Sequence, residues 1–295
     1  MRRLSIWAFT ISGLGIAPAA WCACVPSSAT DLQLQILGSG GPRASSGRGS
    51  AAYLLWVDGV GRVLVDMGGG TKDQFFAAGG NLDDIELIAL SHLHPDHSAE
   101  LPALLWPDRV SFDVAGPTTG NVFPSIEQFL ERLFGPDGAF EISGPRLDLH
   151  PITVDAASRS GAEVWRSGAL HITGKGVPHG DVPTIGYRVD LGDHSIAFSS
   201  DQNGSDSTWI DFIDGVDVLV IHLGGGENST GPTAALHAKP SVWGQMAEAA
   251  GVAHLIVSHI STSSADELAE SLRYIAQNYS GRTTVAEDLM CIDVE

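Results

Sequence analysis

The chain has few cysteines, few basic residues and few long apolar runs, and each shortage excludes a class of protein. Its 295 residues include only Cys22, Cys24 and Cys291, so neither a disulfide framework nor a cysteine metal cluster is expected. Sixteen lysines and arginines stand against 35 aspartates and glutamates, giving a formal charge of −19. Such a surface repels nucleic-acid phosphate and carries no offsetting basic cluster, so a large nucleic-acid substrate is not expected.

The N-terminal segment has the layout of a targeting signal. Arg2 and Arg3 precede an uncharged, largely apolar stretch, Leu4–Ile16, which leads to small residues around Ala19. A basic start, an apolar middle and a small-residue site in this order are typical of a secretory signal peptide. We therefore expect cleavage after Ala19 or a few residues later.

The remaining chain is long enough for one large domain. We assign residues 1–24 to the signal peptide, 25–30 to a linker and 31–295 to a single α/β domain. No other segment reaches the roughly 18 apolar residues of a membrane span, so no transmembrane helix is expected in the mature protein. The expected location is periplasmic or secreted. A lipid anchor on Cys24 is an alternative, although Trp21 stands where such a signal carries a leucine-like residue.

Apolar patterning predicts strands that end in glycine-rich or polar loops. Leu32–Leu37 alternates apolar and polar residues and predicts a strand with one buried face. Asp58-Gly59 is a hairpin signal between two further strands, and a helix is expected over Thr71–Ala78. The second half repeats this order of paired strands followed by alternating helices and strands. The pattern predicts an α/β fold in which two mixed β-sheets form a sandwich with outer helices, four layers in the order αββα.

The middle of the chain, residues 101–166, has the weakest pattern. Pro124–Phe134 is expected to form an amphipathic helix followed by a Gly-Pro-Asp-Gly turn. We expect this region to be a lid or a substrate-selecting insertion, and the sequence does not distinguish the two.

The strongest motif is His92-Leu93-His94-Pro95-Asp96-His97, which follows an apolar strand-like run. Neutral imidazole and carboxylate are good ligands of Zn²⁺ and similar divalent cations. His92 and His94 are two residues apart, so an extended backbone turns both rings to one side, where they can share one metal. Asp96 and His97 follow the turn at Pro95 and can face a second position.

Further ligands are needed, because a metal is held by three to five groups. His179, Asp201 and His259 each lie just past an apolar strand in a loop flanked by glycine or serine. His237 precedes a helix and could approach the metals without binding them. His222 lies inside an apolar strand and is expected to be a hydrogen-bonded core residue. The remaining histidines are expected to be structural or solvated: His150, His171, His194 and His254.

The order of these residues resembles the metallo-β-lactamase fold of hydrolases, in its ribonuclease Z-like branch. The likeness covers nearly all of the mature chain and includes the following segments: Leu37–Pro42 with Arg48, Val65–Gly68, the metal loop, Val182–Arg188, Phe198–Asp201, His237, Ser258-His259 and Ala286–Asp288. The motif is specific for the fold and much less so for the substrate, because that fold hosts many hydrolases.

The resemblance implies how the ligands are divided. It implies one metal held by His92, His94 and His179, another held by Asp96, His97 and His259, and Asp201 bridging the two. Two divalent ions are expected, with Zn²⁺ first and Mn²⁺ or Fe²⁺ as alternatives. Asp96 would also orient or deprotonate the attacking water, and His237 would protonate the leaving group.

Two departures separate this sequence from ribonuclease Z. Leu223 stands where the relatives carry a glutamate that pairs with the equivalent of His237, so the proton relay is incomplete. Ser200 replaces a glycine before the bridging aspartate. The chain also has no basic, glycine- and proline-rich arm for gripping tRNA.

These observations favour an exported di-metal hydrolase that uses a metal-bridging hydroxide on a small phosphodiester, such as a cyclic nucleotide, or a related ester. One alternative is an arylsulfatase, lactonase or β-lactamase-type hydrolase. Others are a ribonuclease Z-like tRNA 3′ processing endonuclease and a non-catalytic metal-binding module. The expected partner is a small anionic or ester substrate, and a homodimer is left open.

Overall fold

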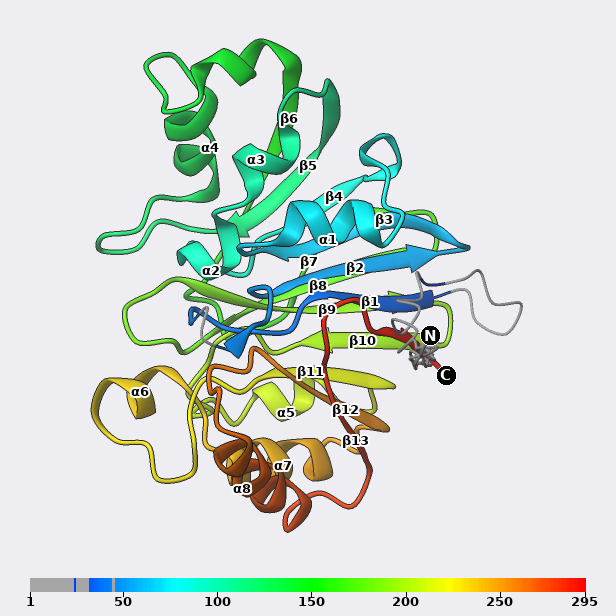
Figure 1. Cartoon of the computed structure of the whole chain (residues 1–295), viewed down its shortest axis with the longest axis vertical. Helices are drawn as coiled ribbons and strands as arrows, with labels where there is room; N and C mark the ends of the chain where they lie inside the picture. The colour runs from blue at the N-terminus through cyan, green and yellow to red at the C-terminus, as the bar shows by residue number, and fades with distance from the viewer. Residues whose placement is uncertain (1–23, 25–31, 44–45) are drawn as a thin grey trace, which may run out of the picture.

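The structure is a computed structural model that describes residue 24, residues 32–43 and residues 46–295 (Figure 1). The predicted signal peptide, apart from Cys24, and the predicted linker lie outside the described residues.

Within the described residues the strands form two seven-stranded sheets. The first has the order β14-β1-β2-β3-β4-β5-β6, antiparallel from β14 to β3 and parallel from β3 to β6. Its strands are β1 (Leu32–Gly38), β2 (Ala52–Val57), β3 (Val60–Met67), β4 (Leu87–Ala89), β5 (Val110–Pro117), β6 (Leu147–Val154) and β14 (Cys291–Asp293).

The second sheet has the order β13-β12-β11-β10-β9-β8-β7, parallel from β13 to β10 and antiparallel from β10 to β7. Its strands are β7 (Ala162–Ser167), β8 (Leu170–Val177), β9 (Thr184–Leu191), β10 (His194–Phe198), β11 (Val218–His222), β12 (His254–Ser258) and β13 (Arg282–Val285). Both sheets are mixed, as predicted.

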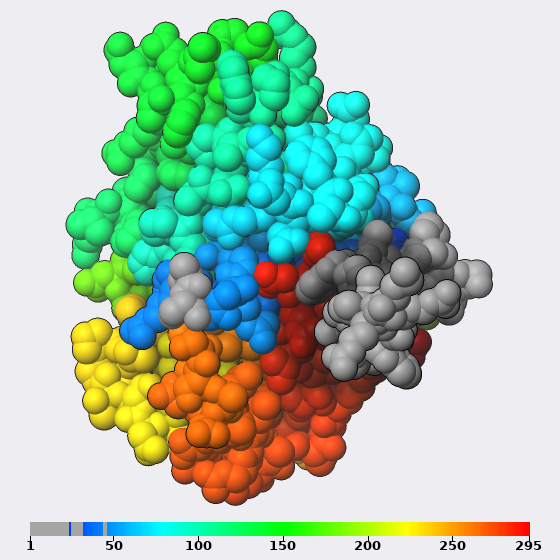
Figure 2. Space-filling view, viewed as in Figure 1, coloured from blue at the N-terminus to red at the C-terminus, as the bar shows by residue number. Residues whose placement is uncertain are grey.

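Helices complete the outer layers (Figure 1). On the first sheet lie α1 (Thr71–Ala77), α2 (Pro95–Ser98), α3 (Leu101–Leu105) and α4 (Ile126–Phe134), with 3₁₀ turns at Leu82–Asp84 and Glu141–Arg146. The second half contributes α5 (Trp209–Phe212), α6 (Gly231–Leu236), α7 (Pro240–Ala249) and α8 (Ala265–Ala276). The space-filling view shows the N-terminal half above the C-terminal half (Figure 2).

Three apolar clusters separate the four layers, and the alternation of side chains along each strand explains them. In β2, Tyr53 and Leu55 enter the cluster between the sheets, whereas Leu54 enters the cluster beneath α1, α3 and α4. In β11, Val220 faces the other sheet, and Leu219 packs under α5, α7 and α8. Each large side chain buried in this way contributes roughly 1.5–3 kcal/mol. The predicted αββα sandwich is confirmed.

Several local predictions also hold. Asp58 and Gly59 form the expected hairpin turn, with φ angles of 51° and 74°. α1 and α4 lie where helices were expected, and a capping box between Ser125 and Gln128 fixes the start of α4.

The middle region differs from the expectation of an insertion. β5 and β6 are integral strands of the first sheet and pair in parallel over eight residues each. Only the segment between them, with α4, projects from the sheet (Figure 1). β6 was hard to predict because most of its side chains are exposed or half-buried, so it lacks the apolar run of a central strand.

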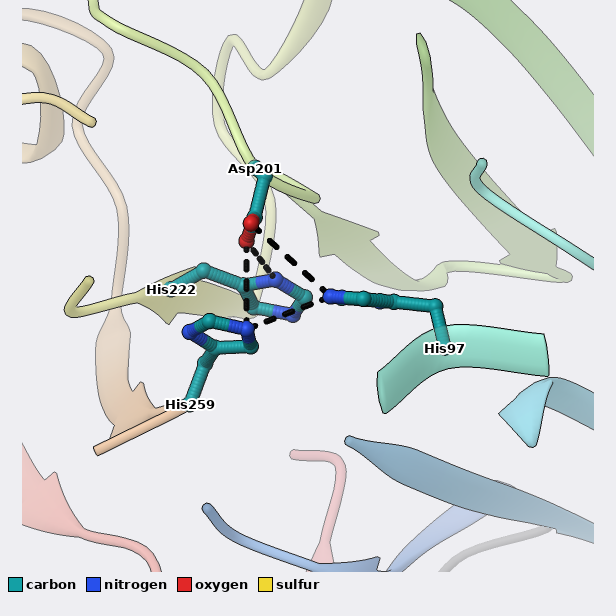
Figure 3. Close-up of side chains that lie close together, drawn as sticks. All are labelled: His97, Asp201, His222 and His259. Atoms are coloured by element: carbon teal, nitrogen blue, oxygen red, sulfur yellow. Dashed lines mark hydrogen bonds and ion pairs between the residues drawn. The ribbon is translucent and has the colours of Figure 1, made fainter. Parts of the chain in front are cut away.

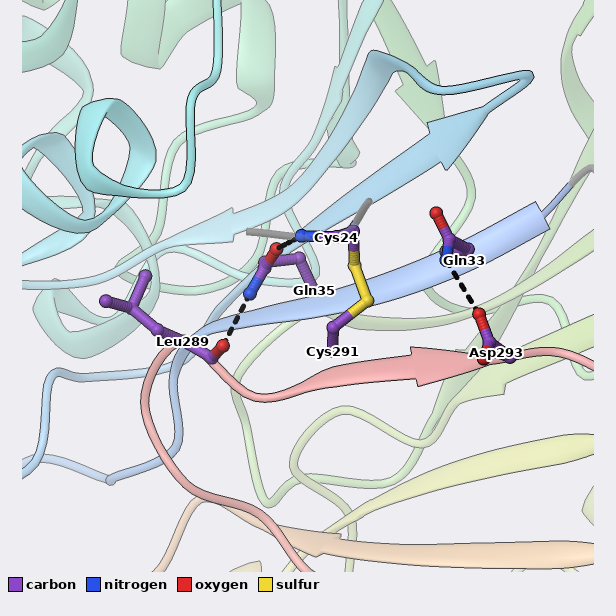
Figure 4. The surroundings of a disulfide bond; sticks show 6 residues. All are labelled: Cys24, Gln33, Gln35, Leu289, Cys291 and Asp293. Atoms are coloured by element: carbon purple, nitrogen blue, oxygen red, sulfur yellow. Dashed lines mark hydrogen bonds between the residues drawn. A yellow bond between two sulfur atoms is a disulfide. The ribbon is translucent and has the colours of Figure 1, made fainter. Parts of the chain in front are cut away.

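The sequence predicted no disulfide framework, and the described residues contain one disulfide. Cys24 and Cys291 form a disulfide that links the N-terminal segment to β14 (Figure 4). Gln33 and Gln35 are buried, so β1 has two buried faces and not the single one predicted. Gln35 accepts a hydrogen bond from Cys24 N at 2.9 Å and donates one to Leu289 O at 2.6 Å. Gln33 donates to Asp293 at 2.6 Å.

The disulfide bears on the lipid anchor considered for Cys24. In this structure the sulfur that a thioether-linked lipid would need is bonded to Cys291. The end of the predicted signal peptide stays a prediction, because residues 1–23 lie outside the described residues. No helix in the part of the chain that the structure describes is long and apolar enough to cross a membrane.

Candidate metal centre

The predicted ligands come together because each follows the carboxyl end of a strand. His92 follows β4, His179 follows β8, Asp201 follows β10 and His259 follows β12. Parallel strands deliver their carboxyl ends to one edge of a sheet, and the two sheets of this sandwich share that edge.

The helix α2 positions the rest of the metal loop. His94 is its N-cap residue and Pro95 its first residue, a position at which proline needs no hydrogen-bond donor. Asp96 and His97 are therefore held in the first turn. Two other loops are strained: Ser200 and His259 both have φ 52°, a left-handed conformation that is rare for residues with a side chain.

Three imidazoles form one half of the centre. His92 Nε2 lies 3.0 Å from His94 Nδ1. The His179 ring lies 5.1 Å from the His92 ring and 5.3 Å from the His94 ring, centroid to centroid. Nε2 of His179 is buried and has no hydrogen-bond partner among the described residues. These three residues offer ligand atoms close enough for one ion.

The other half contains His97, His259 and Asp96. His97 Nε2 and His259 Nε2 are 3.2 Å apart (Figure 3). Asp96 Oδ2 lies 3.2 Å from His259 Nε2 and 3.6 Å from His97 Nε2. The group of possible ligand atoms in this half joins His97 and His259 to Asp201 and His222, so the share of Asp96 in this position stays a prediction.

Asp201 lies between the two halves. Its Oδ2 is 3.7 Å from His179 Nε2 and 3.8 Å from His97 Nε2. Its Oδ1 is 3.5 Å from His259 Nε2 and 3.0 Å from His222 Nδ1. One carboxylate therefore faces both sets of nitrogens, as a bridging ligand must.

Hydrogen bonds at the opposite nitrogens orient three of the rings. His92 Nδ1 lies 3.1 Å from Ser91 Oγ, and His179 Nδ1 lies 2.9 Å from Leu236 O. His97 Nδ1 lies 2.8 Å from Asp66 Oδ2. A ligating histidine commonly makes such a bond, which fixes the tautomer and aims the free nitrogen.

Asp66 is a functional residue that sequence reasoning did not single out. It also accepts hydrogen bonds from Ser91 N at 2.7 Å and Ser91 Oγ at 2.8 Å, so it braces the start of the metal loop. The available signal was a carboxylate at the end of an apolar strand, just before a glycine-rich loop.

The protonation states of the side chains in this centre favour the binding of a cation. Burial opposes the charge of Asp201, but His259 and the hydrogen bond from His222 outweigh it and hold the pKa of Asp201 well below its usual range. Burial opposes the charge of Asp96 as well, yet the bond to His259 lowers the pKa of Asp96 to about 2.

Burial lowers the pKa of His92 and His179, so both rings keep a free lone pair. Burial also disfavours charge on His97, but Asp66 and the other carboxylates raise its pKa to about 9.

The donor set therefore fits divalent metal ions. Inward nitrogens approach one another at 3.0 and 3.2 Å, and the inward nitrogen of His179 has no protein partner. Negative carboxylates surround them. Such an arrangement is explained by cations that the nitrogens and carboxylates share.

His222 is the buried, hydrogen-bonded core histidine that was predicted, and it also borders the centre. Its Nδ1 meets Asp201 and its Nε2 lies 3.1 Å from the Tyr53 hydroxyl. Both nitrogens are thus engaged by protein, although its position is close enough for metal binding. The other four histidines expected to be structural or solvated lie outside the metal-ligand groups found among the described residues.

His237 reaches the centre from the end of α6. Its Nδ1 lies 3.8 Å from Asp201 Oδ2, and its ring lies 5.4 Å from the His179 ring. That nitrogen is buried without a hydrogen-bond partner among the described residues, while the side chain as a whole is 14% exposed. His237 can therefore face both the centre and an entering molecule.

A cavity of about 740 Å³ opens beside His237. Helix α6 and the loops after β11 and β12 line it with hydroxyl groups, including those of Thr233, Ser261 and Ser264. Its described lining has no phenylalanine, tyrosine or tryptophan, and apart from His237 its one basic side chain is Arg43. On the other side of the centre, Phe123 packs its ring 5.5 Å from that of His94.

The fold and this centre define a metallo-hydrolase of the metallo-β-lactamase superfamily. A family model described as "Beta-lactamase superfamily domain" matches residues 61–260, and the chain belongs to this family.

The most similar relatives include two ribonucleases Z. The protein of Mycobacterium bovis (strain BCG / Pasteur 1173P2) is 25% identical over 277 residues, 89% of this chain and 98% of that protein. The protein of Mycobacterium sp. (strain KMS) is 27% identical over 185 residues, 58% of this chain and only 61% of that protein's length. Among solved structures, the metallo-beta-lactamase fold protein YhfI from Bacillus subtilis matches with a TM-score of 0.71 and 18% identity, covering 89% of this chain and 98% of that one.

Proposed function

We propose that the protein is an exported hydrolase that uses two divalent metal ions to cleave a small phosphodiester. His92, His94 and His179 would hold one ion, Asp96, His97 and His259 the other, and Asp201 both. Zn²⁺ is the first choice, because this set mixes imidazoles with few carboxylates. The observation that carries the proposal is the position of Asp201, whose Oδ2 faces both His179 and His97 at 3.7 and 3.8 Å.

The two ions would supply Lewis acidity and lower the pKa of an attacking water towards neutrality. Asp96 has a carboxylate that stays ionised, with its pKa lowered to about 2, so it can accept a hydrogen bond from that water and orient it. His237 would serve the opposite side of the reaction. It lies beside the cavity that can receive the leaving alcohol, and Leu223 offers it no carboxylate partner. Burial lowers the pKa of His237 to about 4, so the ring is mostly neutral near pH 7 and would pass its N–H proton to the leaving oxygen only as negative charge develops there.

The cavity supports a small substrate with one phosphodiester. Glu227 and Glu267 line it, and both are already engaged, by Ser241 and Thr262 respectively. With Arg43 as its one basic side chain besides His237, the lining offers little to a polyphosphate. Its hydroxyl groups instead favour an uncharged, hydroxyl-bearing alcohol such as the sugar of a nucleotide.

A substrate panel tests the reaction class. Purified protein loaded with Zn²⁺ or Mn²⁺ is offered bis-p-nitrophenyl phosphate, p-nitrophenyl sulfate, a lactone and nitrocefin. We expect turnover of the phosphodiester. Activity confined to the sulfate ester would indicate an arylsulfatase, activity confined to the lactone or nitrocefin would indicate an acyl hydrolase, and absence of all turnover would favour a metal-binding module.

Ribonuclease Z activity is the second candidate, favoured by the relatives at 25% and 27% identity. Against it stand the formal charge of −19 and the leucine at position 223. Cleavage of a precursor tRNA at its 3′ end, under conditions where the small phosphodiester is untouched, would replace the first proposal with this one.

Export is supported by the disulfide, because disulfides persist mainly in oxidising compartments. The N-terminal pattern of basic and apolar residues supports it independently. Cell fractionation tests it, and a wholly cytoplasmic protein would contradict it. Size-exclusion chromatography with light scattering would show whether the protein forms the homodimer that the sequence left open.

A further inference from the structure

A buried hydrogen-bonded chain leads away from Asp201 into the core. His222 Nδ1 is 3.0 Å from Asp201 Oδ1, and His222 Nε2 is 3.1 Å from the Tyr53 hydroxyl. The same hydroxyl lies 2.9 Å from Ser258 Oγ, directly before His259. All of these side chains are at most 3% exposed. Figure 3 shows the His222 ring reaching Asp201 from the side opposite His97.

The chemistry of these groups determines which atom donates and which accepts in each of these hydrogen bonds. A carboxylate can only accept hydrogen bonds, so Nδ1 of His222 must carry the proton that Asp201 Oδ1 receives. In the neutral ring Nε2 is then an acceptor, and the Tyr53 hydroxyl is the donor in reach. The single proton of this hydroxyl can serve His222 Nε2 or Ser258 Oγ, and it serves His222 when the Ser258 hydroxyl rotates to donate to the Tyr53 oxygen. Without that donor, the Asp201 carboxylate alone would favour the proton on Nδ1, and the tautomer with the proton on Nε2, in which Nδ1 presents a lone pair to the carboxylate, would become more populated.

The bond from His222 also decides how the carboxylate is turned. It occupies Oδ1, while Oδ2 faces His179 and His97. Tyr53 is well placed to hold this arrangement, because its ring is fixed between the sheets and packs 5.3 Å from the Phe198 ring, centroid to centroid. Its hydroxyl projects out of an otherwise apolar cluster towards the metal centre.

We propose that Tyr53 is a positioning residue of the metal centre: through the tautomer of His222 it holds the Asp201 carboxylate turned towards both metal positions. The inference rests on the proposed role of Asp201 as a shared ligand. It assigns a role to a core tyrosine whose hydroxyl bonds His222 and Ser258.

A double-mutant cycle on metal affinity tests the inference. Tyr53→Phe removes the hydroxyl and keeps the ring. His222→Asn keeps an N–H near the position of Nδ1 and has no group at the position of Nε2. Zn²⁺ affinity is measured by competition with a chromophoric chelator, and the environment of the centre by the absorption spectrum of the Co²⁺-loaded protein.

We expect Tyr53→Phe to weaken Zn²⁺ binding about 10-fold, the scale seen when the partner of a ligand is lost, and to alter the Co²⁺ spectrum. In the His222→Asn background, Tyr53→Phe should change the affinity less than about 2-fold, because the path from Tyr53 to Asp201 is already broken. Equal effects in both backgrounds, or unchanged affinity in Tyr53→Phe alone, would overturn the inference.

Tyr279→Phe is the matched control. Tyr279 is also buried, and its hydroxyl donates one hydrogen bond, to Val252 O at 2.9 Å, away from the metal centre. It should lower the melting temperature as Tyr53→Phe does and leave Zn²⁺ affinity unchanged. An equal loss of affinity in Tyr279→Phe would mean that Tyr53 acts only through general stability.

The result of the double-mutant cycle does not depend on whether the proposed reaction is correct. Zn²⁺ affinity and the Co²⁺ spectrum can be read whether or not the protein cleaves a phosphodiester. A wild-type protein that binds Zn²⁺ but lacks this activity would contradict the proposed function alone. A wild-type protein that binds neither ion would overturn the metal centre and this inference with it.

Discussion

The His237 ring lies directly against the Cα atom of Gly224, so that a methyl group on that glycine would come within 2.5 Å of His237 Cγ. Contacts this short do not occur between real side chains, and the ring would have to move. Glycine at position 224 is therefore a condition for His237 to face the metal centre.

We expect Gly224→Ala to lower kcat by about 10- to 100-fold with metal content intact, since it displaces a group that acts on the leaving alcohol. His237→Ala should give a similar loss. Steady-state kinetics and metal analysis check this. Gly226→Ala is the control, because nothing lies within 4 Å of a methyl group at that position. Full activity in Gly224→Ala would contradict the role of His237.

Replacing a ligand of one half of the centre should lower metal content and turnover together. We expect His92→Ala to lose at least one of two bound ions, because His94 and His179 alone leave that position under-coordinated. Elemental analysis of the purified protein measures the loss. A matched substitution, His254→Ala, removes a buried histidine that bonds Thr284 far from these ligands, and it should keep both ions. An active, fully loaded His92→Ala protein would refute the ligand assignment.

Removing the metal ions should destabilise the fold. Ions that bind only the native state stabilise it by about 4 kcal/mol when present at 1,000 times their dissociation constant. Chelation should therefore lower the melting temperature measured by calorimetry, and added Zn²⁺ should restore it. A melting temperature indifferent to chelator and to Zn²⁺ would show that the cluster binds no ion in the native state.

His254 makes stability depend on pH. Its burial, together with the nearby Arg282, lowers its pKa to about 4 in the folded protein. The unfolded chain, with a histidine pKa near 6.5, binds more protons between these values, so stability is lost as pH falls from about 6.5 to 4. The loss should be roughly 1–2 kcal/mol, allowing for solvent near the ring. His254→Gln should flatten this part of the profile of unfolding free energy; an unchanged slope would contradict the assignment.

Reducing the disulfide should cost stability without removing the metal ligands. We expect Cys291→Ser to lower the free energy of unfolding by about 2–4 kcal/mol, as measured by urea titration. Peptide mass spectrometry of the non-reduced protein should recover Cys24 linked to Cys291. Recovery of both cysteines as free, alkylatable thiols from oxidised protein would contradict the disulfide.

The sequence predicted the fold correctly, and the seven candidate ligands that it singled out lie around one centre, because both depend on local patterns. A ligand-type residue just past an apolar strand, as at His179 or His259, is visible in a few neighbouring residues. The sequence did not predict contacts between residues that are distant from each other along the chain. Asp66 meets His97 across 31 residues, and Cys24 meets Cys291 across 267.

The error at β1 has a similar cause. Alternating leucine and glutamine predicts a strand with one buried and one solvent-exposed face, which is correct only if water covers the second face. Here the second face is buried too, and Gln33 and Gln35 bond to Asp293, Cys24 and Leu289, which all lie outside β1 in the sequence. β6 was missed for the opposite reason, since its mostly exposed side chains give no apolar signal.

The pairing of β1 with β14 has a consequence for how the protein is made. The first long strand of the chain gains its edge partner, and its disulfide, only from residues 291–293. Until those residues have been synthesised, the edge of β1 is an open template for other strands. Closure of the first sheet therefore waits for residues 291–293, and a chain interrupted before them would keep that edge of β1 exposed.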